Sequence, residues 1–176
     1  MTVRPAKLSD AIAIADLHAE SWRSSYRGIL RHEFLDGPVI QDRRKLWEAR
    51  LSRSPEPETQ LVWVIEHGGV LTAFVCAFLD ADPEWGALLD NLHVSPSSKG
   101  QGLGRRLMAE VAGWVLQHRP DSRLHLWVLE KNVPARRFYE HLGGVVTGRH
   151  ANLAPDGSYV EAVRYGWEDL LGFTVR

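Results

Sequence analysis

The sequence predicts an α+β protein in which helices flank a mixed α/β sheet. Two β-rich runs around paired glycines, within residues 60–82, predict an antiparallel hairpin. The order strand, glycine loop, helix, strand over residues 87–129 predicts two parallel neighbouring strands with a right-handed crossover. The 176 residues, 44% of them hydrophobic, are enough for one well-buried core but not for two, so we expect a single domain spanning residues 1–176.

The N-terminal half is predicted to be mainly helical. A short strand around Val3 is followed by a helix that Ser9 can cap and that ends near Tyr26 to Gly28. The apolar face of this helix is formed by Ala11, Ile12, Ala15, Leu17, Ala19 and Trp22.

A second helix is predicted after Pro38, because Leu46, Trp47 and Leu51 fall on one side of it. The charged run "DRRK", residues 42–45, is assigned to the opposite, solvated side. The segment "SRSPEPET", residues 52–59, contains two prolines that a helix cannot accommodate, so we expect an internal loop there.

The C-terminal half alternates strands and helices. Strands are predicted at "ALLDNLHV" (87–94), "RLHLWVL" (123–129) and within "SYVEAVRYGWEDL" (158–170), with a late hairpin near "NLAPDGSY" (152–159). A helix at 104–118 follows the glycine loop, and its apolar face is formed by Leu103, Leu107, Val111, Trp114 and Val115. A last helix, 134–142, is expected to end at Gly143-Gly144 in a left-handed cap.

Composition excludes several classes of function. The formal net charge of −1 gives no long-range attraction to polyanions, so we expect no nucleic-acid partner. Cys76 is the single cysteine, which rules out an internal disulfide or a thiolate metal site, and the histidines show no ligand spacing, so no metal is expected. The N-terminus lacks the apolar core of a signal peptide, and no apolar run approaches the roughly 20 residues of a membrane span. We therefore expect a soluble, cytoplasmic protein with no membrane partner.

The glycine loop "KGQGLG", residues 99–104, is the first candidate site. A loop of small residues at a helix start exposes unpaired amides and the positive end of the helix dipole, and both attract phosphate. It is not a P-loop, because Gly104 is followed by Arg105-Arg106 rather than by Lys and Ser or Thr. It is not a dinucleotide fingerprint either, because Leu107 stands where the third glycine would fall.

Two stretches resemble the GNAT superfamily of acyl-CoA-dependent N-acyltransferases. In "LHVSPSSKGQGLGRRLM", Lys99, Gly102 and Gly104 match the Arg/Gln-x-x-Gly-x-Gly/Ala signature of that superfamily. In "LWVLEKNVPARRFYEHLGG", a second signature, Asn-x-x-Ala-x-x-Phe-Tyr, is matched by Asn132, Ala135, Phe138 and Tyr139. The resemblance covers residues 88–145 well and the N-terminal half loosely.

The resemblance implies a GNAT fold, with a mostly antiparallel central sheet and two splayed parallel strands, and acetyl-CoA as the acyl donor. The loop would wrap the pyrophosphate, where Lys99 replaces the usual Arg or Gln but keeps a cation, and the pantetheine arm would pair with Leu92, His93 and Val94. Asn132 is expected to cap its helix or to bond the pantetheine. The residues expected to contact the donor are Leu92, His93, Val94, Lys99, Gly100, Gln101, Gly102, Leu103, Gly104, Arg105, Asn132, Ala135, Phe138 and Tyr139.

The resemblance also implies catalytic roles. Tyr139 would donate a proton to the departing thiolate, because a tyrosine stays protonated at neutral pH, and the backbone N–H of Val94 would stabilise the oxyanion. The superfamily often carries a glutamate base where this chain has Leu88. Asp90 is the expected substitute, while Glu84 and His93 are weaker candidates, since His93 projects to the other strand face unless a bulge turns it. Deprotonation through water is the remaining alternative.

The acceptor is expected to bind at the end of the first helix. Trp22 and Tyr26 would shield the amine, and Arg27 would hold a substrate carboxylate. We expect a small-molecule amine, attacked directly in a ternary complex. The alternatives are an N-acetyltransferase acting on proteins or peptides, and a non-catalytic acyl-CoA sensor. A homodimer is compatible with the sequence, which does not define the oligomeric state or the acyl chain length.

Overall fold

The computed structural model describes residues 1–52 and 59–174. A seven-stranded sheet runs through it in the order β1-β2-β3-β4-β5-β7-β6. The strands are β1 (Thr2–Pro5), β2 (Gln60–His67), β3 (Val70–Asp82), β4 (Gly86–Val94), β5 (Leu124–Leu129), β6 (Val145–Leu153) and β7 (Tyr159–Trp167). Neighbouring strands are antiparallel except for β4 and β5, which are parallel, so the predicted fold class is confirmed.

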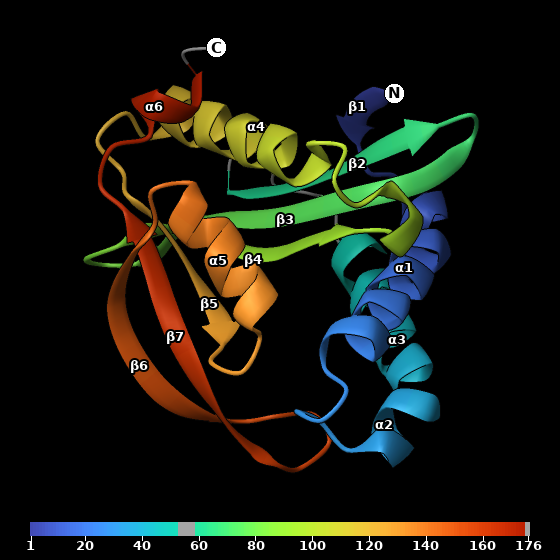
Figure 1. The fold of residues 1–176 in the computed structure, drawn as a ribbon. Coiled ribbons are helices and arrows are strands. Elements are labelled where there is room, and N and C mark those ends of the chain that lie inside the picture. The colour runs from blue at the N-terminus through green and yellow to red at the C-terminus, as the bar shows by residue number, and fades with distance from the viewer. Residues whose placement is uncertain (53–58, 175–176) are drawn as a thin grey trace.

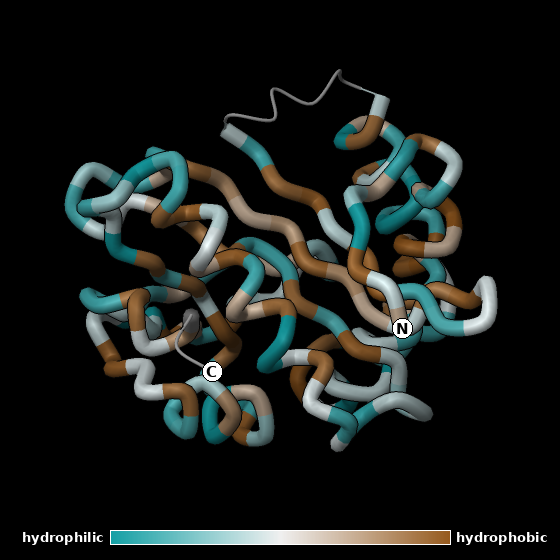
Figure 2. The backbone as a smooth tube through the Cα atoms, turned by 90° about the horizontal axis from the view of Figure 1, so that it is seen from above, coloured by the Kyte–Doolittle hydropathy of each residue, from teal (hydrophilic) through white to brown (hydrophobic). Residues whose placement is uncertain are grey.

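Helices cover both faces of the sheet (Figure 1). The longer ones are α1 (Ala11–Ser25), α3 (Val39–Ser52), α4 (Leu103–His118) and α5 (Val133–His141), and α2 (His32–Asp36) and α6 (Leu171–Thr174) are short. The main core lies between the sheet and the helices α4, α5 and α6, and a second core packs α1 and α3 on the opposite face, against β2 and β3. Figure 2 shows the hydrophobic stretches that follow the central strands.

The parallel strands β4 and β5 pair only at their beginnings. The paired residues are Ala87 with Leu124 and Leu88 with His125. Beyond them the two strands diverge, so the polar edge of β4 from Leu89 onward has no neighbouring strand on that side. This confirms the splayed pair that the resemblance implies.

The long β6–β7 hairpin curves beneath the open end of the sheet and reaches the segment between α1 and α2 (Figure 1). Leu30 and Leu35 pack there against Ala154 and Val160, and the Arg31 amide donates a 2.7 Å hydrogen bond to Asp156. The expected hairpin near residues 152–159 is therefore present, but the sequence did not predict β6 as a strand, or α2 and α6 as helices.

The turns and the start of α1 test several local predictions. Gly68 and Gly69 have φ values of 59° and 81° in the β2–β3 turn, and Gly143 has a φ of 82° after α5, as expected. Ser9 does not cap α1: a 3-10 turn at Leu8–Asp10 precedes the helix, and Asp10 instead accepts a hydrogen bond from the Lys7 amide. Of the predicted loop at 52–59, residues 53–58 lie outside the described residues.

The charged run at 42–45 is not uniformly solvated. Arg43 is only 9% exposed and lies on the same side of α3 as Trp47, so the prediction was wrong for this residue. Positions 43, 46, 47 and 50 share one helical face, and a long arginine stem can extend along apolar surface there.

Candidate active site

A cleft of about 850 Å³ opens where β4 and β5 diverge. Its walls come from β4, β5, the glycine loop and the helices α1, α3, α4 and α5, with Pro155 of the β6–β7 hairpin at one side. A volume in this range is typical of a site for a small organic ligand. Divergence of the strands therefore creates room for a ligand in the centre of the sheet.

The glycine loop supplies a row of free amides to this cleft. Gly100 and Gly102 have φ values of 78° and 75°, a conformation that L side chains rarely adopt. None of the backbone amides from Gly100 to Arg105 donates a hydrogen bond to another described residue. Gly104 is needed for a different reason, because a Cβ atom there would lie 3.0 Å from the Phe138 ring. The loop can thus hold an anionic group with backbone donors at the start of α4.

The exposed edge of β4 offers a second set of backbone groups. Amides alternate in direction along a strand, and the Ser95 amide donates 2.8 Å toward β3, to the Thr72 carbonyl. The amides of Leu92 and Val94 therefore point the other way, into the gap beside β5. An extended, amide-containing ligand can pair with this edge as an added strand.

Most residues expected to bind the donor lie on the cleft wall. The residues from this set that line it are Leu92, His93, Val94, Lys99, Gly100, Gly102, Leu103, Gly104, Arg105, Asn132, Ala135, Phe138 and Tyr139. Gln101 is exposed and its side chain does not line the cleft, although its amide belongs to the free row. Lys99 and Arg105 have exposed side chains with no carboxylate partner among the described residues, so both can face a phosphate.

Helix α5 positions the tyrosine. The Asn132 side chain caps the helix by accepting a hydrogen bond from the Ala135 amide at 3.4 Å, so the capping role is confirmed. Tyr139 packs beside Phe138, Tyr165 and Trp167, and burial, followed by the nearby Tyr26, raises the pKa of its hydroxyl. The hydroxyl is therefore protonated at neutral pH, and no described residue accepts a hydrogen bond from it.

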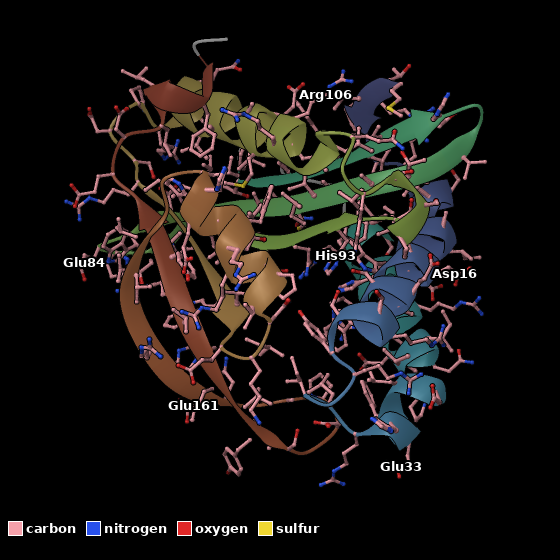
Figure 3. All side chains as sticks on the ribbon, viewed as in Figure 1. Asp16, Glu33, Glu84, His93, Arg106 and Glu161 are labelled. Carbon is pink, nitrogen blue, oxygen red and sulfur yellow. The ribbon has the colours of Figure 1, made fainter. Side chains whose placement is uncertain are left out.

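The three candidate bases occupy different places. Glu84 is exposed at the β3–β4 turn, outside the cleft, and Figure 3 shows it at the far side of the molecule from His93. Asp90 lines the cleft and forms a 2.9 Å ion pair with Arg50 of α3. A β-bulge at Asp90, between the pairs Cys76–Asn91 and Ala77–Leu89, turns His93 to the same face as Leu88.

His93 lies between β4 and α1 (Figure 3). Its Nδ1 atom is 2.8 Å from the Ser21 hydroxyl oxygen, and its ring lies 4.4 Å from that of His18. Burial, and then the charges of Arg43 and Lys99, lower the pKa of His93 to about 3. His93 is therefore a neutral imidazole at physiological pH.

On the acceptor side, Trp22 and Tyr26 line the cleft as expected, and burial raises the pKa of Tyr26 to about 12. Arg27 does not line it: its guanidinium is exposed and paired with Asp36. Other wall residues were not predicted from the sequence, and they include Ser21, Arg43, Leu46, Arg50, Asn91, Trp127 and Pro155. The positions of Arg43 and Arg50 on the apolar face of α3 were the signal that could have found two of them.

Within residues 1–52 and 59–174, no cluster of His, Cys, Asp or Glu side chains is suited to hold a metal ion. No helix in the same residues has the length and apolar character needed to cross a membrane.

The chain belongs to the acetyltransferase (GNAT) family, whose model matches residues 14–144. It is therefore an acyl-CoA-dependent N-acyltransferase, as the resemblance in the sequence implied. It is 29% identical to the uncharacterized N-acetyltransferase YuaI of Bacillus subtilis, over 97% of this chain and 94% of that protein. It is 31% identical to a probable N-acetyltransferase of Mycobacterium tuberculosis, over 87% of this chain and 84% of that protein.

Solved structures share the fold. The PaiA N-acetyltransferase of Thermoplasma acidophilum, in complex with coenzyme A, is similar with a TM-score of 0.72 and 18% identity, covering 92% of this chain and 96% of that chain. A variant of the spermidine N-acetyltransferase SpeG of Vibrio cholerae is similar with a TM-score of 0.66 and 18% identity, covering 100% and 99%. At these identities the likeness describes the fold alone.

Proposed function

We propose that this protein transfers an acetyl group from acetyl-CoA to the primary amine of a small molecule, by direct attack within the cleft. The free amides of the glycine loop carry the proposal, because they lie in the same cleft as an unpaired tyrosine hydroxyl and the open edge of β4. Coenzyme A in the solved PaiA structure and the matched family support acetyl-CoA as the acyl donor.

Each residue has a distinct role in the proposed reaction. The amides at 100–105, with Lys99 and Arg105 beside them, hold the donor's diphosphate, and the edge of β4 at Leu92 and Val94 pairs with its amide-containing arm. Bound acetyl-CoA supplies an acyl group activated as a thioester. The Val94 N–H stabilises negative charge on the carbonyl oxygen, and the Tyr139 hydroxyl gives its proton to the leaving sulfur.

The proton of the amine passes to Asp90 in this proposal. An amine with a pKa near 10.4 is almost fully protonated at pH 7, so some group must accept a proton before or during attack. Asp90 is exposed and hands the proton on to solvent easily, whereas His93 would become charged in a largely apolar position. The ion pair with Arg50, at 2.9 Å, orients the Asp90 carboxylate.

The test combines purified protein, acetyl-CoA and a panel of amines, amino acids and peptides, with free thiol as the readout. Thiol release that depends on a small amine supports the proposal, and release only with peptides favours the protein N-acetyltransferase. Binding of acetyl-CoA, measured by calorimetry, without thiol release from any acceptor favours the acyl-CoA sensor and contradicts the proposal.

A further inference from the structure

Arg43 is a buried cation in the wall of the acceptor half of the cleft. It projects from α3, its side chain is only 11% exposed, and it lines the cleft together with Leu46 and Arg50 of the same helix. A buried charge is costly unless it is paired, so its position needs a reason.

The surroundings of Arg43 fix the guanidinium and leave one edge open. Asp42 accepts hydrogen bonds from Nε, at 2.9 Å, and from Nη2. The guanidinium carbon lies 4.2 Å from the centre of the Trp22 ring, in a cation–π arrangement. Nη1 has no hydrogen-bond acceptor among residues 1–52 and 59–174, it keeps some accessible surface, and Arg43 lines the cleft. A fixed guanidinium with a free N–H edge is well suited to bind a carboxylate.

Charge on the cleft wall favours the same kind of ligand. The charged side chains that line it, within the described chain, are Arg43, Arg50, Lys99, Arg105 and Asp90. Lys99 and Arg105 flank the glycine loop, and Arg50 is held by Asp90 and Asn91 at 2.9 Å each. Asp90, the ion-pair partner of Arg50, lines the cleft beside it, whereas Asp42, the partner of Arg43, does not line the cleft. Within the described chain, Arg43 is thus the acceptor-side cation whose carboxylate partner lies outside the cleft wall. A purely cationic polyamine would be repelled from this wall.

The remaining surface of the acceptor half is apolar and aromatic. Trp22 of α1 and Tyr26, the residue that caps this helix, pack with tilted rings whose centres are 5.3 Å apart. Trp127 of β5 and Leu46 of α3 complete this part of the wall. Such a surface buries an apolar or aromatic body while the polar groups fix its orientation.

We propose that the acceptor is a small primary amine that also carries a carboxylate and an apolar body, and that the Nη1 edge of Arg43 binds the carboxylate. This inference rests on the proposed acetyl transfer and narrows its substrate class. Binding the carboxylate to α3 places the amine on the β4 side of the cleft, toward Tyr139 and the edge of β4. Arg43 is a specificity residue here, and it takes no part in proton transfer.

Matched acceptor pairs test the substrate class. Phenylalanine is compared with phenethylamine, and leucine with isoamylamine, with spermidine as a polycation, all at saturating acetyl-CoA. We expect kcat/KM to be at least about tenfold higher for the member with the carboxylate, and spermidine to be the poorest acceptor. Equal or reversed preferences, with turnover of some amines, overturn this inference and leave the acetyl transfer standing. If no amine of this panel is acetylated, both this inference and the proposed acetyl transfer are overturned.

Variants test the residue. Arg43→Gln should raise KM for the preferred amino acid at least about tenfold, while KM for its carboxylate-free partner and the Kd of acetyl-CoA change less than about twofold. Arg44→Gln is the matched control, because Arg44 is the exposed neighbour that pairs with Asp16 outside the cleft. Calorimetry of the amino acid against the enzyme saturated with coenzyme A gives a readout independent of turnover. Equal loss of affinity for both members of a pair would overturn the role of Arg43.

Discussion

The hydroxyl of Tyr139 lies among aromatic rings, where it stays protonated and has no proton acceptor in the described protein. We therefore expect Tyr139→Phe to lower kcat by about a hundredfold or more, the usual contribution of a general acid. The Kd of acetyl-CoA should change little, because the ring that lines the cleft is retained. Single-turnover thiol release and calorimetry measure the two quantities separately.

The matched control is Tyr159→Phe, the same change at a side chain that is 80% exposed and lies outside the cleft. It should leave kcat unchanged. An unchanged kcat in Tyr139→Phe would remove the acid role and leave a buried tyrosine whose contribution is packing alone.

At single residues, the sequence predicted positions best where a motif fixes the backbone or the helical face of a side chain. Gly102, Asn132 and Tyr139 lie where the motif implied, because their positions follow from a loop, a cap and a helical face. Arg27 and Arg43 show the opposite case. The long side chain of Arg27 can reach either Asp36 or the cleft, and that of Arg43 either solvent or the cleft. Only tertiary contacts decide between these positions.

At the scale of an element, the start of α4 depends on Gly102, the left-handed residue that precedes Leu103. We expect Gly102→Glu to abolish measurable binding of acetyl-CoA. A side chain at a φ of 75° is strained, and a carboxylate beside the free amides would compete with and repel a diphosphate. Isothermal titration calorimetry with acetyl-CoA gives the direct measurement.

Gly113→Glu is the control within the same helix. A Cβ atom at Gly113 would meet nothing within 4 Å, and this residue does not line the cleft. The Kd of this variant should match that of the unmodified protein, and its circular dichroism should be the same. Retained donor affinity in Gly102→Glu would contradict the assignment of the glycine loop.

Elements with strong periodicity were predicted well, and those without it were missed. Helices α1 and α4 have broad apolar faces, whereas β6 is an edge strand whose residues are mostly exposed, so burial did not impose an alternating pattern on it. The bulge at Asp90 leaves no mark in the sequence either. It breaks the period of two within β4, so the strand face to which His93 projects depends on a bulge that the sequence does not reveal.

At the scale of the whole molecule, the fold divides the cleft between two sets of elements. The groups proposed to bind the donor come from β4, α4 and α5, which pack in the main core. The groups proposed to bind the acceptor come from α1, α3 and the tip of the β6–β7 hairpin, which pack in separate, smaller cores. The sequence predicted the first half through its motifs. It predicted the second half poorly because residues far apart in the chain meet there.

Three histidines with lowered pKa values link the stability of the whole molecule to pH. The pKa values of His18, His93 and His125 are all lowered, chiefly by burial, and His18 is fully buried with Nδ1 accepting from the Trp47 indole N–H at 2.9 Å. Below pH 6.5 the unfolded chain binds more protons at these sites than the folded protein does, so the free energy of unfolding falls as pH falls.

We therefore expect a loss of about 2 to 4 kcal/mol in the free energy of unfolding between pH 7.5 and pH 5.5, measured by urea titration at each pH. Carboxylates such as Asp10, whose pKa is lowered by Arg4, change the free energy of unfolding only at lower pH, near about 4. The variant His18→Gln should reduce the slope of stability against pH, whereas His32→Gln, at an exposed position, should leave it unchanged. A free energy of unfolding that stays constant across this range would contradict this expectation, because the lowered pKa values of the three histidines mean that protonation favours the unfolded chain.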